Sequence, residues 1–206
     1  MDTLQEPTGA FMSALVTEHS VLQGARSTLT GEIASRAALY LGSLTGSLIA
    51  LGFVAQDRAV LGPFATAILP ALLILGEFTY WRLVQGGIED IRHSWEIHRI
   101  RAYYRQLAPP GMAFFADAEP KAFAGPERRF IGIRARDLNV LLGAASMVAA
   151  INSMLAGAGV ALALGAAANI SASEAVALAA LIAVLLYLAH SRLAISRYQA
   201  GLADFT

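Results

Sequence analysis

The chain has 206 residues, of which 56% are hydrophobic, and its mean hydropathy is positive. This composition is too apolar for an ordinary soluble domain and excludes an intrinsically disordered chain. The 15 basic and 15 acidic residues cancel, and cysteine is absent. Net charge therefore gives no reason to expect a nucleic-acid partner, and disulfides, thiolate metal sites and a cysteine nucleophile are excluded.

Four stretches of the chain carry almost no charge and are long enough to cross a bilayer. They are Ala37 to Gln56, Ala59 to Trp81, Leu138 to about Gly165, and Ala175 to Ser191. A hydrocarbon core of roughly 30 Å requires about 20 apolar residues in a helix. The sequence therefore predicts an all-α membrane protein with four transmembrane helices, arranged as two hairpins at residues 37–81 and 138–191.

The segments outside the spans also have a helical pattern. Residues 1–36 contain Phe11, Leu15, Leu22 and Leu29 at helical spacing, which predicts a helix leading into the first span. Residues 82–137 begin as an amphipathic continuation of the second helix, which we expect to stop at Pro109-Pro110-Gly111 and to give way to a loop. Residues 192–206 form a short tail. Pro70, near the middle of the second span, predicts a kink.

The distribution of charge predicts the topology. Between Arg82 and Arg136 there are ten Lys or Arg residues and six Asp or Glu residues, whereas the other two loops hold only Asp57 with Arg58, and Glu174. The positive-inside rule therefore places the central segment in the cytoplasm. With four spans, both termini lie on the same cytoplasmic side.

Glu77 is the only acidic residue within a predicted span, and it lies about five residues before Arg82. A carboxylate in lipid costs roughly 2.5 kcal/mol or more, so it should face the bundle interior, a water-filled cavity or a partner. One interpretation is an ion-binding or proton-accepting group. The interpretation that we favour is a buried pair with Arg36 or His190, which are expected at similar depth.

The other polar residues of the spans also have two interpretations each. His190 is either a proton-exchanging side chain or, more simply, a polar residue at a helix end near the interface. Asn152 and Ser153 lie near the centre of the third span, where such side chains form hydrogen bonds between helices. The alternative is a pore-lining role for Asn152 and Ser153, together with Ser43 and Ser47 of the first span.

Small residues at regular spacing predict close helix packing. The first span contains Gly42 and Gly46 in GxxxG spacing. The third span carries a longer stripe, which consists of Ala145, Ala149, Ser153, Gly157 and Ala161. Such stripes allow two helix backbones to approach closely in lipid. The stripe of the third span faces either its hairpin partner or another protomer.

The amphipathic helix after the second span carries basic and aromatic residues. They are His93, Trp95, His98, Arg99, Arg101, Tyr103 and Arg105. They form either a surface for a protein partner, an anionic ligand or a lipid headgroup, or the solvent side of a helix that packs on residues 11–30. We favour the second interpretation. His93 and His98 are five residues apart, which does not align two ligands on a helix face, so we expect no metal site.

A resemblance adds to this interpretation. The run from EHSVLQGARSTLTGEIASRAALYLGSLTGSLIALGFVAQ through FATAILPALLILGEFTYWRLVQGGIEDIRHSWEIHRIRAYYRQLAP resembles a widespread group of uncharacterised bacterial membrane proteins with the same two-hairpin layout. The resemblance implies a multi-pass protein of the bacterial inner membrane, and it brings no assigned activity. The first half is also similar in layout to the two-span SLATT effector domains of bacterial defence systems.

The function predicted from these features is a homo-oligomeric channel or pore-like protein of the inner membrane, with no cofactor. The alternative is a non-conducting scaffold, sensor or defence-type effector whose cytoplasmic segment binds a partner or ligand. A secondary transporter ranks third, because the hairpins lack paired broken helices and midplane charges. We expect no enzymatic activity, since no nucleophile arrangement or phosphate-binding loop is recognisable.

Overall fold

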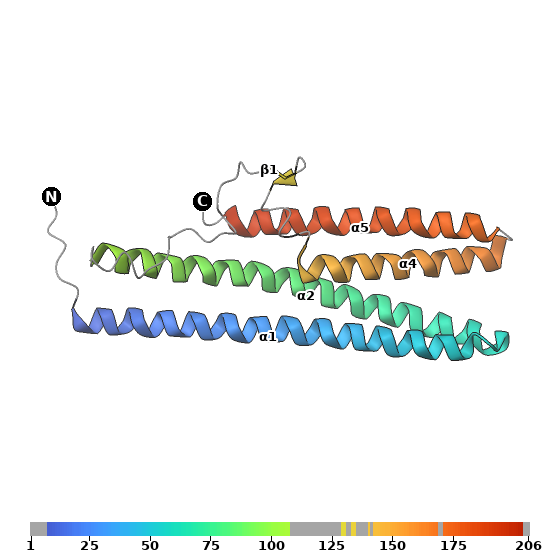
Figure 1. The fold of residues 1–206 in the computed structure, drawn as a ribbon, viewed down its shortest axis with the longest axis horizontal. Coiled ribbons are helices and arrows are strands. Elements are labelled where there is room, and N and C mark those ends of the chain that lie inside the picture. The colour runs from blue at the N-terminus through green and yellow to red at the C-terminus, as the bar shows by residue number, and fades with distance from the viewer. Residues whose placement is uncertain are drawn as a thin grey trace.

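The computed structural model describes residues 8–107, 129–130, 133–134, 140, 142–168 and 171–203, and this part of the chain is built mainly from four long helices (Figure 1). The helices are α1 (Gly9–Val54), α2 (Arg58–Leu107), α4 (Ala144–Ala168) and α5 (Ala172–Ala203). Two short strands, β1 (Arg129–Phe130) and β2 (Ile133–Arg134), pair in antiparallel register. The prediction of an all-α membrane protein with four spans is confirmed.

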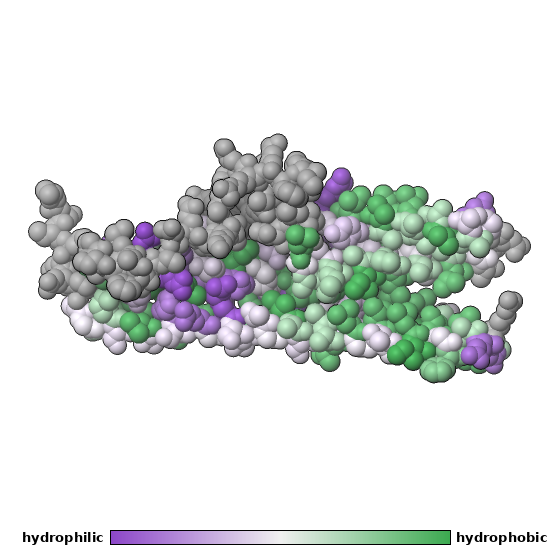
Figure 2. All heavy atoms as spheres, viewed as in Figure 1, coloured by the Kyte–Doolittle hydropathy of each residue, from purple (hydrophilic) through white to green (hydrophobic). Residues whose placement is uncertain are grey.

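Each of the four helices is long and apolar enough to cross a membrane. Little of this apolar surface is enclosed by the protein itself: 11% of the apolar window is buried in α1, 11% in α2, 33% in α4 and none in α5. In Figure 2, hydrophobic residues cover the half of the molecule at right, where all four helices run together. This surface requires lipid, so the chain is a multi-pass membrane protein.

Helices α1 and α2 form an antiparallel hairpin that is longer than a bilayer is thick. With 46 residues, α1 extends for about 69 Å, more than twice the thickness of a hydrocarbon core. The parts of α1 and α2 beyond the other two helices pack through Leu22, Ile97 and Ile100. The predicted docking of the amphipathic segment on residues 11–30 is thus confirmed for its apolar side.

Helices α4 and α5 form a second antiparallel hairpin, which packs against α2. A capping box starts α5: Ser171 N donates to the Glu174 carboxylate at 2.8 Å, and Glu174 N donates to Ser171 Oγ at 3.3 Å. The beginning of α1 and the end of α5 point to one end of the molecule, and both hairpin turns lie at the other (Figure 1). We call the end at which α1 begins and α5 ends the charged end, and it includes the parts of α1 and α2 that extend beyond the other two helices.

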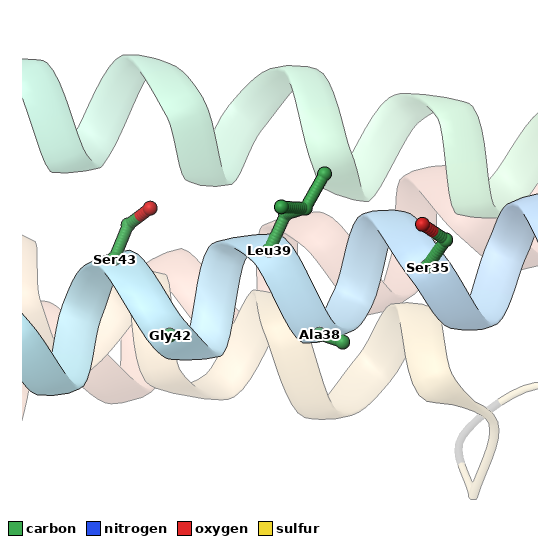
Figure 3. Close-up of a pocket in the computed structure, with 5 residues that line it drawn as sticks. All are labelled: Ser35, Ala38, Leu39, Gly42 and Ser43. Atoms are coloured by element: carbon green, nitrogen blue, oxygen red, sulfur yellow. The ribbon is translucent and has the colours of Figure 1, made fainter.

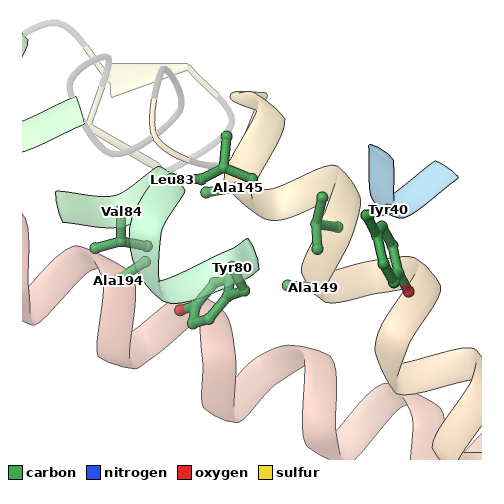
Figure 4. Packing of buried hydrophobic residues seen from close by; sticks show 8 residues of the cluster. Tyr40, Tyr80, Leu83, Val84, Ala145, Ala149 and Ala194 are labelled. Carbon is green, nitrogen blue, oxygen red and sulfur yellow. The ribbon is translucent and has the colours of Figure 1, made fainter. Parts of the chain in front are cut away.

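A buried cluster joins all four helices at the level where the charged end begins (Figure 4). It consists of Tyr40 from α1, Tyr80, Leu83 and Val84 from α2, Ala145, Val148 and Ala149 from α4, and Ala194 from α5. Two large tyrosine rings fit there because the facing positions of α4 and α5 are alanines. This packing fixes the rotation of each helix about its axis and thereby positions the polar side chains one turn away.

Several predicted boundaries differ from the structure. The third span was expected to begin at Leu138, but α4 begins at Ala144, after a turn at residues 142–143. There, Ser146 Oγ donates to the Val140 carbonyl at 2.9 Å, which stabilises the turn. Helix α2 continues through Pro63 and Pro70 and ends at Leu107, just before the predicted stop. The expected loop over 109–130 lies outside the described residues up to 128, and its last two residues form β1, whose pairing with β2 was not predicted.

Candidate functional site

Glu77 lies on α2 and makes two hydrogen bonds through the same carboxyl oxygen. Asn152 Nδ2 donates to Oε1 at 2.8 Å, and His190 Nε2 lies 2.9 Å from the same atom. Of the two partners expected from the sequence, the structure brings His190 to Glu77. The other, Arg36, instead pairs with Glu32 at 2.9 Å, four residues earlier on its own helix.

Asn152 is 2% exposed and holds the carboxylate from α4. Its Nδ2 also donates to the Leu73 carbonyl at 3.3 Å, and its Oδ1 lies 3.5 Å from the hydroxyl of Tyr40, which donates to it. Gly76 makes room for this amide, because a Cβ at position 76 would lie 2.6 Å from Asn152 Cγ. Asn152 therefore bonds helices inside the protomer and is not available to line a path between protomers.

His190 is fixed on three sides. Its Nδ1 lies 2.8 Å from the Leu186 carbonyl, one turn earlier on α5. The Tyr80 ring lies edge-on to the imidazole, with centroids 4.8 Å apart, and the Tyr80 hydroxyl donates to the His190 carbonyl at 2.6 Å. His190 is therefore a fully engaged member of the bundle and more than a polar residue at a helix end.

These contacts unite residues from all four helices, and we call them the Glu77 cluster. Its members are Tyr40, Glu77, Tyr80, Asn152 and His190. The Glu77 side chain is 43% exposed at the protein surface, whereas that of His190 is 15% exposed. A carboxylate that is held by donors on one side and open on the other can bind a proton or a cation. Ionisable groups at such depth in a membrane protein usually mark a functional site.

The stripe of small residues on α4 is buried throughout its length. Ala145, Ala149, Ser153, Gly157 and Ala161 are all enclosed. A Cβ on Gly157 would lie 3.2 Å from the carbonyl carbon of Ala179 and 3.3 Å from Ala183 N, both in the backbone of α5. The stripe is therefore enclosed within the protomer, and at Gly157 it meets its hairpin partner, α5. Ser153 Oγ is buried and has no hydrogen-bond partner among the described residues.

The small residues of α1 behave in the opposite way. Gly42, Ser43 and Gly46 are exposed and Ser47 is half-buried. A Cβ on Gly42 or Gly46 would meet nothing within 4 Å. An open hollow of about 530 Å³ lies along this face. It is lined by Ser35, Ala38, Leu39, Gly42 and Ser43, whose positions on α1 are shown in Figure 3. The described part of the protomer therefore leaves this face of α1 uncovered.

Ion pairs hold the charged end together, and the sequence did not reveal them. Arg26 Nε lies 2.7 Å from Asp90 Oδ1, and Arg82 pairs with Glu32 at 2.9 Å. The Arg82 guanidinium, and secondarily that of Arg36, lowers the pKa of the Glu32 carboxyl to about 2. The signal that could have found these pairs is the alternation of opposite charges along the facing sides of two antiparallel helices.

In the described part of the chain, no three His, Cys, Asp or Glu side chains lie close enough together to hold a metal ion. His98 instead stacks edge-on against Trp95, with centroids 6.0 Å apart. A ligand on the basic and aromatic surface of α2 stays a prediction.

Comparison with known proteins gives no relative from which a role could be transferred. No family model matches the chain, and no curated protein or solved structure matches it either.

Proposed function

We propose that the protein acts as a homo-oligomeric channel or pore-like protein of the bacterial inner membrane, with its termini in the cytoplasm and with no catalytic role. The observation that carries this proposal is the uncovered face of α1 at Gly42, Ser43 and Gly46, which we call the α1 face. Its hollow is lined by small, partly polar side chains and one exposed leucine, Leu39, so it offers less apolar side chain to lipid than the outer surface of α5 does.

The outer surface of α5 provides the comparison. Its exposed residues are large and apolar: Val176 is 70% exposed, Leu181 56%, Val184 55%, Leu185 58% and Leu188 46%. This is the pattern expected where a helix meets acyl chains. By contrast, glycines and a serine on α1 would allow another helix to approach closely, and the hydroxyl would gain a polar neighbour. A second copy of the chain is the simplest partner for this face.

A path between copies would then follow polar groups of α1. Ser43 is exposed and Ser47 half-buried, one helical turn apart. Asn152 is enclosed inside the protomer, so it contributes by holding Glu77 instead of lining the path. Ser43 and Ser47 therefore line the proposed path, whereas Asn152, Ser153 and His190 belong to the interior of the bundle.

The alternative is a non-conducting scaffold, sensor or defence-type effector. The charged end supports it, because Leu22, Ile97 and Ile100 pack α1 and α2 into a hairpin well beyond the spans. The pairs Arg26–Asp90 and Arg82–Glu32 add to this packing. Such an extension can present the basic residues of α2 to a cytoplasmic protein or an anionic ligand.

The test uses the full chain in nanodiscs and liposomes. We expect wild-type protein to be oligomeric by single-molecule photobleaching and to pass ions after reconstitution, and Gly42→Leu to be monomeric and inactive. Gly62→Leu is the matched control, because Gly62 also has open space around it but lies on α2. An oligomer that passes no ions would favour the alternative, and a monomeric wild type would exclude both the shared face and the path.

A further inference from the structure

The contact between Glu77 and His190 allows a direct count of hydrogens. His190 Nδ1 lies 2.8 Å from the Leu186 carbonyl oxygen, and a carbonyl oxygen can only accept. Nδ1 must therefore carry a hydrogen and donate it. The other ring nitrogen, Nε2, faces Glu77 Oε1 at 2.9 Å.

That second contact requires one hydrogen between its two atoms. Either Nε2 carries it, which makes His190 an imidazolium beside a carboxylate, or Oε1 carries it, which makes both side chains neutral. In both forms the pair has no net charge. Without this hydrogen, two lone pairs would face each other at 2.9 Å and the pair would have a charge of −1 inside the bundle, which is unfavourable.

The remaining carboxylate oxygen offers a route for exchange. Both hydrogen bonds involve Oε1, and among the described residues no donor reaches Oε2. The Glu77 side chain is 43% exposed and lies about one and a half turns from Arg82, where the predicted span ends, so we expect water to reach this oxygen from that end.

We propose that the Glu77–His190 pair is a proton-binding site within the membrane-spanning bundle, which holds one exchangeable proton in this conformation. On release, the N–H or O–H bond between the residues breaks, its electron pair stays on Nε2 or Oε1, and the proton passes to water. On loading, a hydronium ion returns it. This inference depends on the contacts inside one protomer and not on oligomerisation or conduction.

The surroundings of the pair contain few other ionisable groups. Tyr40 of α1 reaches it through Asn152, Tyr80 of α2 contacts the imidazole, and α4 contributes the neutral amide of Asn152. On α5 the partner is the Leu186 carbonyl. Because the Tyr80 hydroxyl donates to the His190 backbone carbonyl, loss of the proton would break the contact between Nε2 and Oε1 without detaching α5 from α2.

The experiment is NMR of the full chain in nanodiscs, with ¹⁵N-labelled histidine and ¹³C-labelled glutamate, between pH 4 and pH 11. The chain has four histidines, and His190→Asn identifies the signal of His190. We expect each titration step seen at the His190 ring to appear at the Glu77 carboxyl at the same pH, because the proton belongs to the pair. Separate steps at the two residues, or no step at either, would overturn the proposal.

A variant provides the second measurement. Glu77→Gln keeps the size of the side chain and, with its carbonyl oxygen in the place of Oε1, an acceptor for Asn152, but it removes the shared proton, so the His190 titration should move away from its wild-type pH. Glu174→Gln is the control, since Glu174 bonds only within the cap of α5, and it should leave the His190 titration unchanged. An unchanged His190 titration in Glu77→Gln would overturn the proposal. Gly42→Leu should keep the coupled titration of Glu77 and His190 whether or not the variant oligomerises. A failure of the proposed channel function would therefore leave the proton-binding site unaffected.

Discussion

Gly76 of α2 lies directly against the side-chain amide of Asn152 on α4, so closely that a Cβ at position 76 would be 2.6 Å from Asn152 Cγ. The Asn152 amide thus occupies the space that a side chain at position 76 would fill. That amide donates in turn to Glu77, one residue along α2. The position of the intramembrane carboxylate therefore depends on a glycine, whose lack of a side chain leaves room for the amide.

Gly76→Ala should lower the stability of the bundle. Overpacking typically costs about 1–3 kcal/mol, and the better helix propensity of alanine recovers up to about 1 kcal/mol. Thermal unfolding in detergent measures the difference. In an Asn152→Ala background the same substitution should cost nothing, because the amide is gone. An equal cost in both backgrounds would contradict the assigned contact.

Gly157→Ala should be more damaging than Gly76→Ala. Its Cβ would meet the backbone of α5 at Ala179 and Ala183, and backbone atoms cannot rotate away as an amide side chain can. We expect a larger fall in the unfolding temperature and a looser hairpin by protease sensitivity. Gly165→Ala is the control, since its surroundings are open. Equal unfolding temperatures for the two variants would argue against the close approach of α4 and α5.

The Glu32–Arg82 pair should make stability depend on pH in acid. The pKa of Glu32 is lowered from 4.5 to about 2 in the folded protein, so its stabilising effect is present above pH 4.5 and is lost as the pH falls towards 2. The unfolding temperature of Glu32→Gln should therefore approach that of wild type over this range. In an Arg82→Gln background, the effect of Glu32→Gln should be much smaller. A difference that stays constant from pH 5 to pH 2 would contradict the pairing.

The sequence was sufficient to predict the spans and to name two candidate partners for Glu77. Apolar length alone located the four membrane helices, because lipid imposes a minimum on each. His190 was a candidate partner for Glu77 because the sequence placed both residues at a similar depth in the membrane, near the ends of their helices. It could not choose between His190 and Arg36, because that choice depends on the rotation of α1 and α5 about their axes.

Contacts that depend on helix rotation were beyond the sequence. The bond from Asn152 to Glu77 requires α4 to present one side to α2, which the tyrosines Tyr40 and Tyr80 fix by packing on alanines. The sequence also placed the start of the third span at Leu138 instead of Ala144, because the apolar residues from Leu138 onward are compatible with both a turn and a helix. Similar patterns of small residues on α1 and α4 gave no sign that one is open and the other enclosed.

The most direct test of the proposed path uses the absence of cysteine, which makes any introduced thiol unique. Ion flux through liposomes containing Ser43→Cys should be blocked by a charged, membrane-impermeant thiol reagent. Flux through the cysteine-free wild type should be unaffected, as should flux through Ile74→Cys, on α2 and 57% exposed. Block of Ser43→Cys alone is the result we predict. Flux that is equally insensitive in all three proteins, or absent from all three, would contradict a conducting path along the α1 face.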